Sequence, residues 1–189
     1  MLVFLVIFCV LIALGFGLAS GWSDFRGMVI SNIYPAGVIL AFIPAYAAVT
    51  VMMPDADYFF SWKSHLLAFA VMFAVTFGLY SGGLLGAGDS KLSAAFALWV
   101  GLQGLIAFVF YMALCGGLLG LAALALRKWK PVQAPPAGSW VARAQEGGSA
   151  VPYGIAIATG AVVAFYMNGY FDPDHLATLA GVAADEAGS

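Results

Sequence analysis

The longest apolar stretch of the chain runs from Leu92 to Leu126 and reads LSAAFALWVGLQGLIAFVFYMALCGGLLGLAALAL. A helix needs about 20 apolar residues to cross the roughly 30 Å hydrocarbon layer of a membrane, so this stretch is too long for one crossing. The segment Gly101-Leu102-Gln103-Gly104 supplies a polar, glycine-bounded break within it. We therefore expect two membrane-spanning helices here, one on each side of the break.

The composition of the whole chain agrees with a membrane protein. Of the 189 residues, 63% are hydrophobic and 8% are charged, whereas a water-soluble domain is about 45–50% apolar and about 25% charged. A soluble enzyme and a nucleic-acid-binding protein are therefore excluded. Four further apolar blocks are Leu2–Ala19, Tyr34–Met53, Leu66–Tyr80 and Val151–Tyr170. We expect an all-α integral membrane protein with six transmembrane helices. The first block lacks the basic start of a signal sequence and is expected to be retained.

Basic residues predict the orientation of these six helices. They fall almost entirely in the first, third and fifth loops: Arg26, Lys91, Arg127, Lys128, Lys130 and Arg143. Only Lys63 lies in an even-numbered loop. Because cytoplasmic loops carry the excess of Lys and Arg, the odd-numbered loops are predicted to be cytoplasmic and both termini to face outward. Residues 1–189 are expected to form a single membrane domain, with 130–150 as a mobile linker rich in Pro, Gly, Ala and Ser.

Two acids at the predicted cytoplasmic face have similar surroundings. Asp24 follows the first apolar block in Gly21-Trp22-Ser23-Asp24-Phe25-Arg26, and Asp89 precedes the fourth in Gly86-Ala87-Gly88-Asp89-Ser90-Lys91. Two carboxylates brought close together cannot both ionise easily, so they share a proton and titrate as a pair. The ionised carboxylate can then take a proton from water while the protonated one polarises a carbonyl, as in aspartic proteases. Small bundles can bring such loop ends together, which makes Asp24 and Asp89 candidate catalytic residues.

Structural roles explain the same residues one at a time. An Asp before a helix is a preferred N-cap, which suits Asp89, and Ser23 or Asp24 could cap a second helix. Arg26 and Lys91 are typical topology anchors, although they could also bias the acid pair or attract an acidic substrate. Gly86 and Gly88 are common turn residues, although glycine also lets a substrate backbone approach closely. Cys9, Cys115, His65 and His175 show no metal-ligand spacing, so no metal site is expected.

Three motifs together resemble the type IV prepilin peptidases, which are membrane aspartic proteases of the GxGD class. Gly86-Ala87-Gly88-Asp89-Ser90-Lys91-Leu92 is similar to their GxGDxKL signature. Asp24-Phe25-Arg26, followed by Ile30-Ser31-Asn32, is similar to their first motif, with Ser31 where many relatives have Pro. Pro152-Tyr153-Gly154-Ile155-Ala156-Ile157 is similar to the opening of their last helix. The motifs occur in the expected order across nearly the whole chain.

The resemblance implies both an activity and its residues. It implies that Asp24 and Asp89 are catalytic and that Arg26, Asn32, Gly86, Gly88, Lys91, Pro152, Tyr153 and Gly154 bind substrate or support the site. The reaction would remove the leader of a type IV, Flp-like prepilin at the cytoplasmic face of a bacterial inner membrane. The short form is similar to the Tad/Cpa-type peptidases and to archaeal preflagellin peptidases. The paired-Cys insertion that accompanies N-methylation in larger relatives has no counterpart here, so methyltransferase activity is not expected. The implied partners are the prepilin and membrane lipid, without a cofactor or nucleic acid.

Two other functions stay open from the residues alone. One is a GxGD protease that cuts other membrane proteins, and the other is a small transporter whose paired acids relay protons or bind a cation. Proton-relay acids lie more often within a span than at loop edges. Because no local spacing relates Asp24 to Asp89, we also expect their carboxyl groups to lie too far apart to share a proton until a substrate binds.

Overall fold

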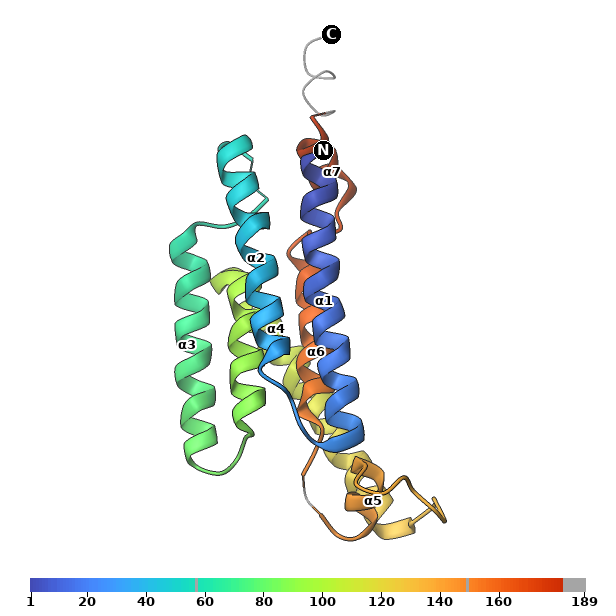
Figure 1. The fold of residues 1–189 in the computed structure, drawn as a ribbon. Coiled ribbons are helices and arrows are strands. Elements are labelled where there is room, and N and C mark those ends of the chain that lie inside the picture. Colours follow the sequence, from blue (N-terminus) through green and yellow to red (C-terminus); the bar gives the residue numbers. More distant parts are fainter. Residues whose placement is uncertain (57, 149, 182–189) are drawn as a thin grey trace.

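Seven helices make up the part of the chain that the computed structural model describes, which is residues 1–181 apart from 57 and 149 (Figure 1). They are α1 (Leu2–Gly27), α2 (Ile33–Met52), α3 (Trp62–Ser81), α4 (Ala87–Trp129), α5 (Trp140–Gln145), α6 (Tyr153–Met167) and α7 (Pro173–Ala180). These residues contain no strand, and the all-α prediction is confirmed. Residue 149 of the expected linker and residues 182–189 lie outside the described part.

Helix α4 is interrupted at Gly101, where the sequence predicted a break. Gly101 has φ 62° and ψ −177°, a backbone conformation that glycine adopts readily because it has no Cβ. Residues 87–100 run beside α3, and the chain then turns back toward the end of the molecule where α5 lies (Figure 1). The glycine thus converts one long apolar run into two helical segments.

The backbone groups exposed by this interruption are bonded by side chains from other elements. A helix end inside an apolar environment needs such partners, because no water is present to satisfy its carbonyls. His65 Nδ1–H donates to the carbonyl of Leu98 at 2.7 Å, and Asn168 Nδ2 donates to that of Val100 at 2.9 Å. The remaining two bonds are Tyr170 Oη–H to the carbonyl of Trp99 and the Leu102 N–H to Ser64 Oγ.

Helix α4 is the centre of the bundle. It packs against α2, α3, α5 and α6, while α1 packs mainly against α2 and α6. Phe96 and Trp99 of α4 are fully buried beside Phe165 of α6, with ring centroids 6.0 and 5.4 Å from it. The N-terminus and α7 lie at one end of the bundle, and α5 lies at the other (Figure 1).

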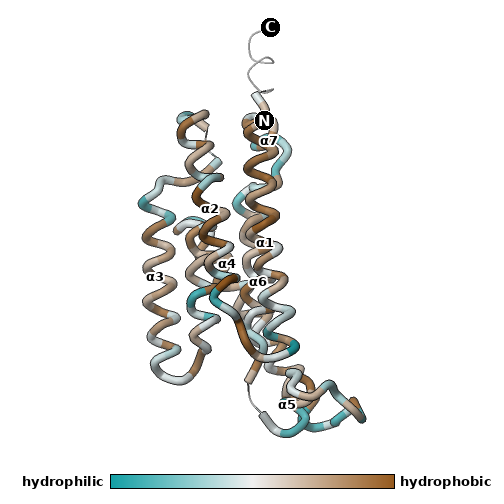
Figure 2. The backbone as a smooth tube through the Cα atoms, in the orientation of Figure 1, coloured by the Kyte–Doolittle hydropathy of each residue, from teal (hydrophilic) through white to brown (hydrophobic). Residues whose placement is uncertain are grey.

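The outer surface of the helices is suited to lipid. Helices α1 to α4 are long and apolar enough to cross a membrane, and α6 is a shorter apolar helix. Large apolar side chains are exposed on the outside, including Phe4 at 75% and Ile106 at 82%. Figure 2 shows hydrophobic colour along the helices and more hydrophilic colour toward their ends and loops. These features describe a multi-pass membrane protein, whereas the count of six crossings and the sidedness of the termini stay predictions.

Residues 130–150 contain a short helix that the predicted linker did not include. They contain helix α5, which begins after Ser139, whose Oγ accepts the N–H of Ala142 at 3.3 Å. Trp140 and Ala144 are buried in a small apolar cluster with Ala123 of α4. The prediction missed this helix because it was based on the high content of Pro and Gly. It did not consider Trp140 and Ala144, which are apolar and one helical turn apart.

Candidate active site

Asp24 lies in the last turn of α1, not after that helix. Its side chain is 6% exposed. The Gly154 N–H, at the start of α6, donates to Asp24 Oδ2 at 2.8 Å. Helices α1 and α6 cross closely here, since a Cβ on Gly21 would lie 3.3 Å from Ile155 Cα. Burial disfavours the charged form of Asp24, and the N–H at the start of α6 offsets part of this cost because the first N–H groups of a helix favour a negative charge.

Asp89 is the third residue of α4, and the N-cap of that helix is Gly86. Asp89 Oδ2 accepts the Gly86 N–H at 3.1 Å. The carboxylate therefore does bond a backbone group at the helix start, but from the N3 position and not as the predicted N-cap. Its other oxygen, Oδ1, is buried without a hydrogen-bond partner. Burying a carboxylate oxygen without a hydrogen-bond partner costs free energy. Capping therefore explains the position of Oδ2 but not the burial of Oδ1.

Both aspartates line one cavity of about 600 Å³. Its walls come from the end of α1, the loop between α3 and α4, α5, and the segment entering α6, with lining residues Asp24, Met28, Gly83, Leu84, Leu85, Gly86, Asp89, Arg143, Ala150, Val151 and Tyr153. No hydrogen bond joins the two carboxyl groups in the described part of the chain. The expected open arrangement and its closure by substrate both stay predictions.

Four of the expected supporting residues lie at or beside this cavity. Gly86 and Tyr153 line it, and Gly154 bonds Asp24. Pro152 is the N-cap of α6 and is buried. A Cβ on Gly154 would lie 3.1 Å from Asp24 Cβ, so a residue without a side chain is needed for this close contact.

The other four expected residues lie elsewhere. Lys91 Nζ donates to Asn32 Oδ1 at 2.9 Å, and both line a separate groove between α2 and α3. The Arg26 guanidinium lies over the ring of Trp22, 5.6 Å from its centroid. A Cβ on Gly88 would lie 2.7 Å from Ile30 Cβ, so Gly88 accommodates the loop after α1, and its approach to a substrate backbone stays a prediction. Sequence proximity to an aspartate did not predict orientation, because residues two apart point to different sides of a helix.

Arg143 and Met28 line the cavity although the sequence interpretation did not place them there. Arg143 comes from α5, and its Nε–H donates to the carbonyl of Gly138 at 3.2 Å. Met28 ends α1 in the left-handed conformation, with φ 55°. Ser139 and the apolar spacing of Trp140 and Ala144 were the available signal for a short docked helix that would carry Arg143.

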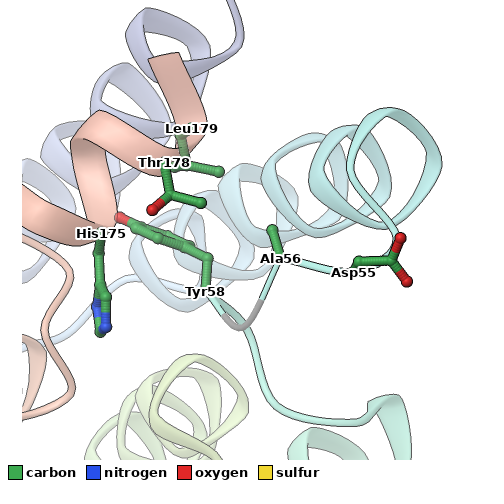
Figure 3. A pocket seen from close by; sticks show the side chains of 6 residues that line it. All are labelled: Asp55, Ala56, Tyr58, His175, Thr178 and Leu179. Carbon is green, nitrogen blue, oxygen red and sulfur yellow. The ribbon is translucent and has the colours of Figure 1, made fainter. Parts of the chain in front are cut away.

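No group of three His, Cys, Asp or Glu side chains that could hold a metal ion occurs among the described residues. A smaller cavity, of about 160 Å³, lies at the opposite end of the bundle (Figure 3), lined by Asp55, Ala56, Tyr58, His175, Thr178 and Leu179. Asp55 and His175 point away from each other in it (Figure 3). Asp55 is the one acidic residue among the described residues that line this smaller cavity. The described lining of the smaller cavity therefore lacks the paired acids of the larger one.

Comparison with known proteins identifies the family. The model of the type IV leader peptidase family matches residues 9–121, which is more than half of the chain. The chain belongs to the type IV leader peptidase family. No curated protein and no solved structure matches it.

The region matched by the family model contains both cavity aspartates and ends before α6. The family match therefore supports a type IV leader peptidase-like protease. The contact between Gly154 and Asp24 joins the unmatched α6 to this site. Two carboxyl groups in one cavity can activate water for attack on a peptide carbonyl, which is the chemistry that a peptidase requires.

Proposed function

We propose that this protein is an aspartic endopeptidase that removes the leader peptide of Flp-like type IV prepilins at the cytoplasmic face of a bacterial inner membrane. The observation that carries the proposal is the shared cavity of Asp24 and Asp89, in a chain of the type IV leader peptidase family. Its volume of about 600 Å³ falls in the range of about 300–1,000 Å³ that is typical of ligand sites. An extended peptide segment could enter between the α3–α4 loop and α5.

The two carboxyl groups have different surroundings, and we assign them different roles. Both carboxyl groups accept a backbone N–H at a helix start, but the second oxygen of Asp89 is buried without a partner. Such burial disfavours the ionised form of Asp89, so Asp24 acts as the general base. Asp89 carries the proton on its unpartnered Oδ1 and donates it as a hydrogen bond to the scissile carbonyl oxygen.

The atoms of the first step then balance. A water molecule loses one proton to Asp24 and forms the new C–O bond. The carbonyl oxygen receives the proton of Asp89. The product of these steps is a tetrahedral intermediate. Its C–N bond then breaks as the leaving amine takes the proton held by Asp24. Asp89 recovers a proton from a hydroxyl group of the intermediate.

Arg143 contributes positive charge to the same cavity. Its guanidinium is anchored by one bond to the Gly138 carbonyl, which leaves its Nη groups to bind substrate carbonyl oxygens. We assign Arg143 to substrate binding, because a guanidinium stays protonated and so cannot act as the general acid or base.

The experiment is incubation of the detergent-purified protein with a Flp-type prepilin, followed by N-terminal sequencing of the product. Cleavage after the terminal glycine of the leader is expected. Activity should persist in EDTA and without S-adenosylmethionine, and mass spectrometry should find an unmodified N-terminal amine. Cleavage of unrelated membrane proteins but not of the prepilin would favour the broader GxGD protease. Dependence on a metal ion would contradict the proposed dyad mechanism.

A further inference from the structure

A groove between α2 and α3 is separate from the aspartate cavity and shares none of its described lining residues. Helices α2 and α3 follow each other in sequence, yet they make little direct contact, and each packs against α4 behind them (Figure 1). The groove has a volume of about 270 Å³ and is lined mostly by apolar side chains: Pro35, Ala36 and Ile39 of α2, Phe69 and Phe73 of α3, and Ala94 of α4. It therefore presents an apolar slot on the lipid-facing side of the bundle.

One end of this slot is polar and positively charged. Asn32 is the N-cap of α2 and Lys91 lies in the second turn of α4, so both lie at the aspartate end of the bundle. Lys91 Nζ donates to Asn32 Oδ1 at 2.9 Å. An ammonium group has three donors, and within the described residues Lys91 has no carboxylate partner. Lys91 and the Asn32 amide N–H groups can therefore bind an anion at the membrane edge.

The charge at one end of the slot decides between two apolar occupants. The apolar helix of a pilin offers no negative charge to Lys91, whereas an anionic phospholipid has a phosphate at one end of its acyl chains. The slot, apolar along its length with Lys91 and Asn32 at one end, therefore suits a lipid.

We propose that this groove binds an anionic phospholipid. Its phosphate contacts Lys91 and Asn32, and one acyl chain lies along Ile39 and Phe73. Basic pockets between membrane helices on the cytoplasmic side are suited to such headgroups. Lys91 is two residues from Asp89, and Ile30, near Asn32, packs on Gly88. Bound lipid would therefore steady the helix start that carries Asp89. The proposal does not depend on the substrate assigned above.

Native mass spectrometry of the full-length protein tests this site without any cleavage assay. Titration with phosphatidylglycerol and with phosphatidylcholine of the same chains should give tighter adducts of the anionic lipid. Lys91→Gln should weaken that binding by about fivefold, the effect of the ~1 kcal/mol that one basic residue contributes near an anionic surface. Lys128→Gln is the matched control, because Lys128 lies in the last turn of α4 and outside the groove, and it should bind like the parent protein. Equal binding of both lipids, or equal loss in both variants, would overturn the proposal.

A second variant separates the chain from the headgroup. Ala36 is exposed in the groove, so Ala36→Phe should fill the slot and reduce phosphatidylglycerol adducts while Lys91 stays in place. Glycerophosphate, which has no acyl chain, should compete only weakly. Full competition by glycerophosphate, or unchanged lipid binding by Ala36→Phe, would show an anion site without a lipid slot. A photo-crosslinker at position 36 that captured a prepilin helix in place of lipid would also contradict the assignment.

Discussion

The interruption of α4 at Gly101 and the aspartate cavity are both polar places in an apolar bundle, but their groups are satisfied differently. At the interruption, the carbonyls of Leu98 and Val100 are bonded by His65 and Asn168. His65 Nε2 lacks a partner there, but as the acceptor nitrogen of a neutral ring it is much less costly to bury than a carboxylate oxygen. In the cavity, the unpartnered atom is a carboxyl oxygen, Asp89 Oδ1.

This difference separates polar groups that hold the fold from polar groups that are available to a ligand. An unsatisfied backbone group in a membrane costs several kcal/mol, so the side chains around Gly101 are needed for folding. The cavity aspartates each use one oxygen for a backbone N–H and keep the rest of the carboxyl group for chemistry. Four predictions test this separation.

Loss of either cavity acid should have the largest effect. We expect Asp24→Asn and Asp89→Asn each to lower the rate of leader cleavage by about 10²–10⁴-fold, which is the contribution of a general acid–base group. Asn can still accept the Gly154 or Gly86 N–H, so the free energy of unfolding should change by less than about 1 kcal/mol. Rates of product formation and a denaturation curve measure the two effects.

Asp172 offers a matched control for that pair. It caps α7 by accepting the N–H of Asp174 at 2.9 Å, far from the cavity. Asp172→Asn should cleave the prepilin at the parent rate. Normal cleavage by either cavity variant would remove that aspartate from the mechanism.

Removal of a partner at the interruption should give the opposite pattern. Asn168→Ala leaves the Val100 carbonyl without its donor, and stability should fall by about 1–3 kcal/mol. The cleavage rate per folded molecule should not change, because Asn168 lies far from the aspartates. Unfolding in SDS, followed by tryptophan fluorescence, gives the stability. Thr50→Ala, which removes a hydroxyl bonded within its own helix, should have little effect. A large loss of rate without loss of stability would erase the distinction between the two regions.

A methyl group beside Asp24 should have an intermediate effect on the rate. Gly154→Ala would place Cβ 3.1 Å from Asp24 Cβ and 3.2 Å from Oδ2, so the carboxylate must shift by a few tenths of an ångström. Small displacements of a catalytic group reduce turnover strongly, and we expect kcat to fall about tenfold. Gly15→Ala is the control, since no atom lies within 4 Å of a Cβ at that position. Equal rates for the two variants would mean that the Asp24 position is not tightly set by α6.

The smallest effect is expected at the cavity cation. Arg143→Gln should raise KM about three- to fivefold with kcat nearly unchanged, because one exposed charged contact contributes up to about 1 kcal/mol. Arg143→Lys should recover part of the loss, whereas Lys128→Gln should leave KM unchanged. Steady-state cleavage kinetics measure both constants. A fall in kcat at constant KM would instead place Arg143 in the chemical step.

The sequence alone was sufficient for the features that depend on composition and local spacing. Apolar runs longer than a membrane is thick predict helices, and Gly101 inside the longest run predicts its interruption. The two Asp motifs also indicated the family, because the residues that carry its signature are contiguous in the chain. These predictions needed no knowledge of which helix lies beside which.

Only the tertiary structure decided how the site is assembled. Gly154 and Asp24 are 130 positions apart, and hydropathy contains no information on which helix start will meet which helix end. Helical geometry then directed Lys91 away from Asp89 and toward Asn32, and a small apolar contact of Trp140 brought Arg143 to the cavity. The helices follow from the burial of apolar residues in lipid, whereas the site depends on close packing and hydrogen bonds between segments that are distant in sequence.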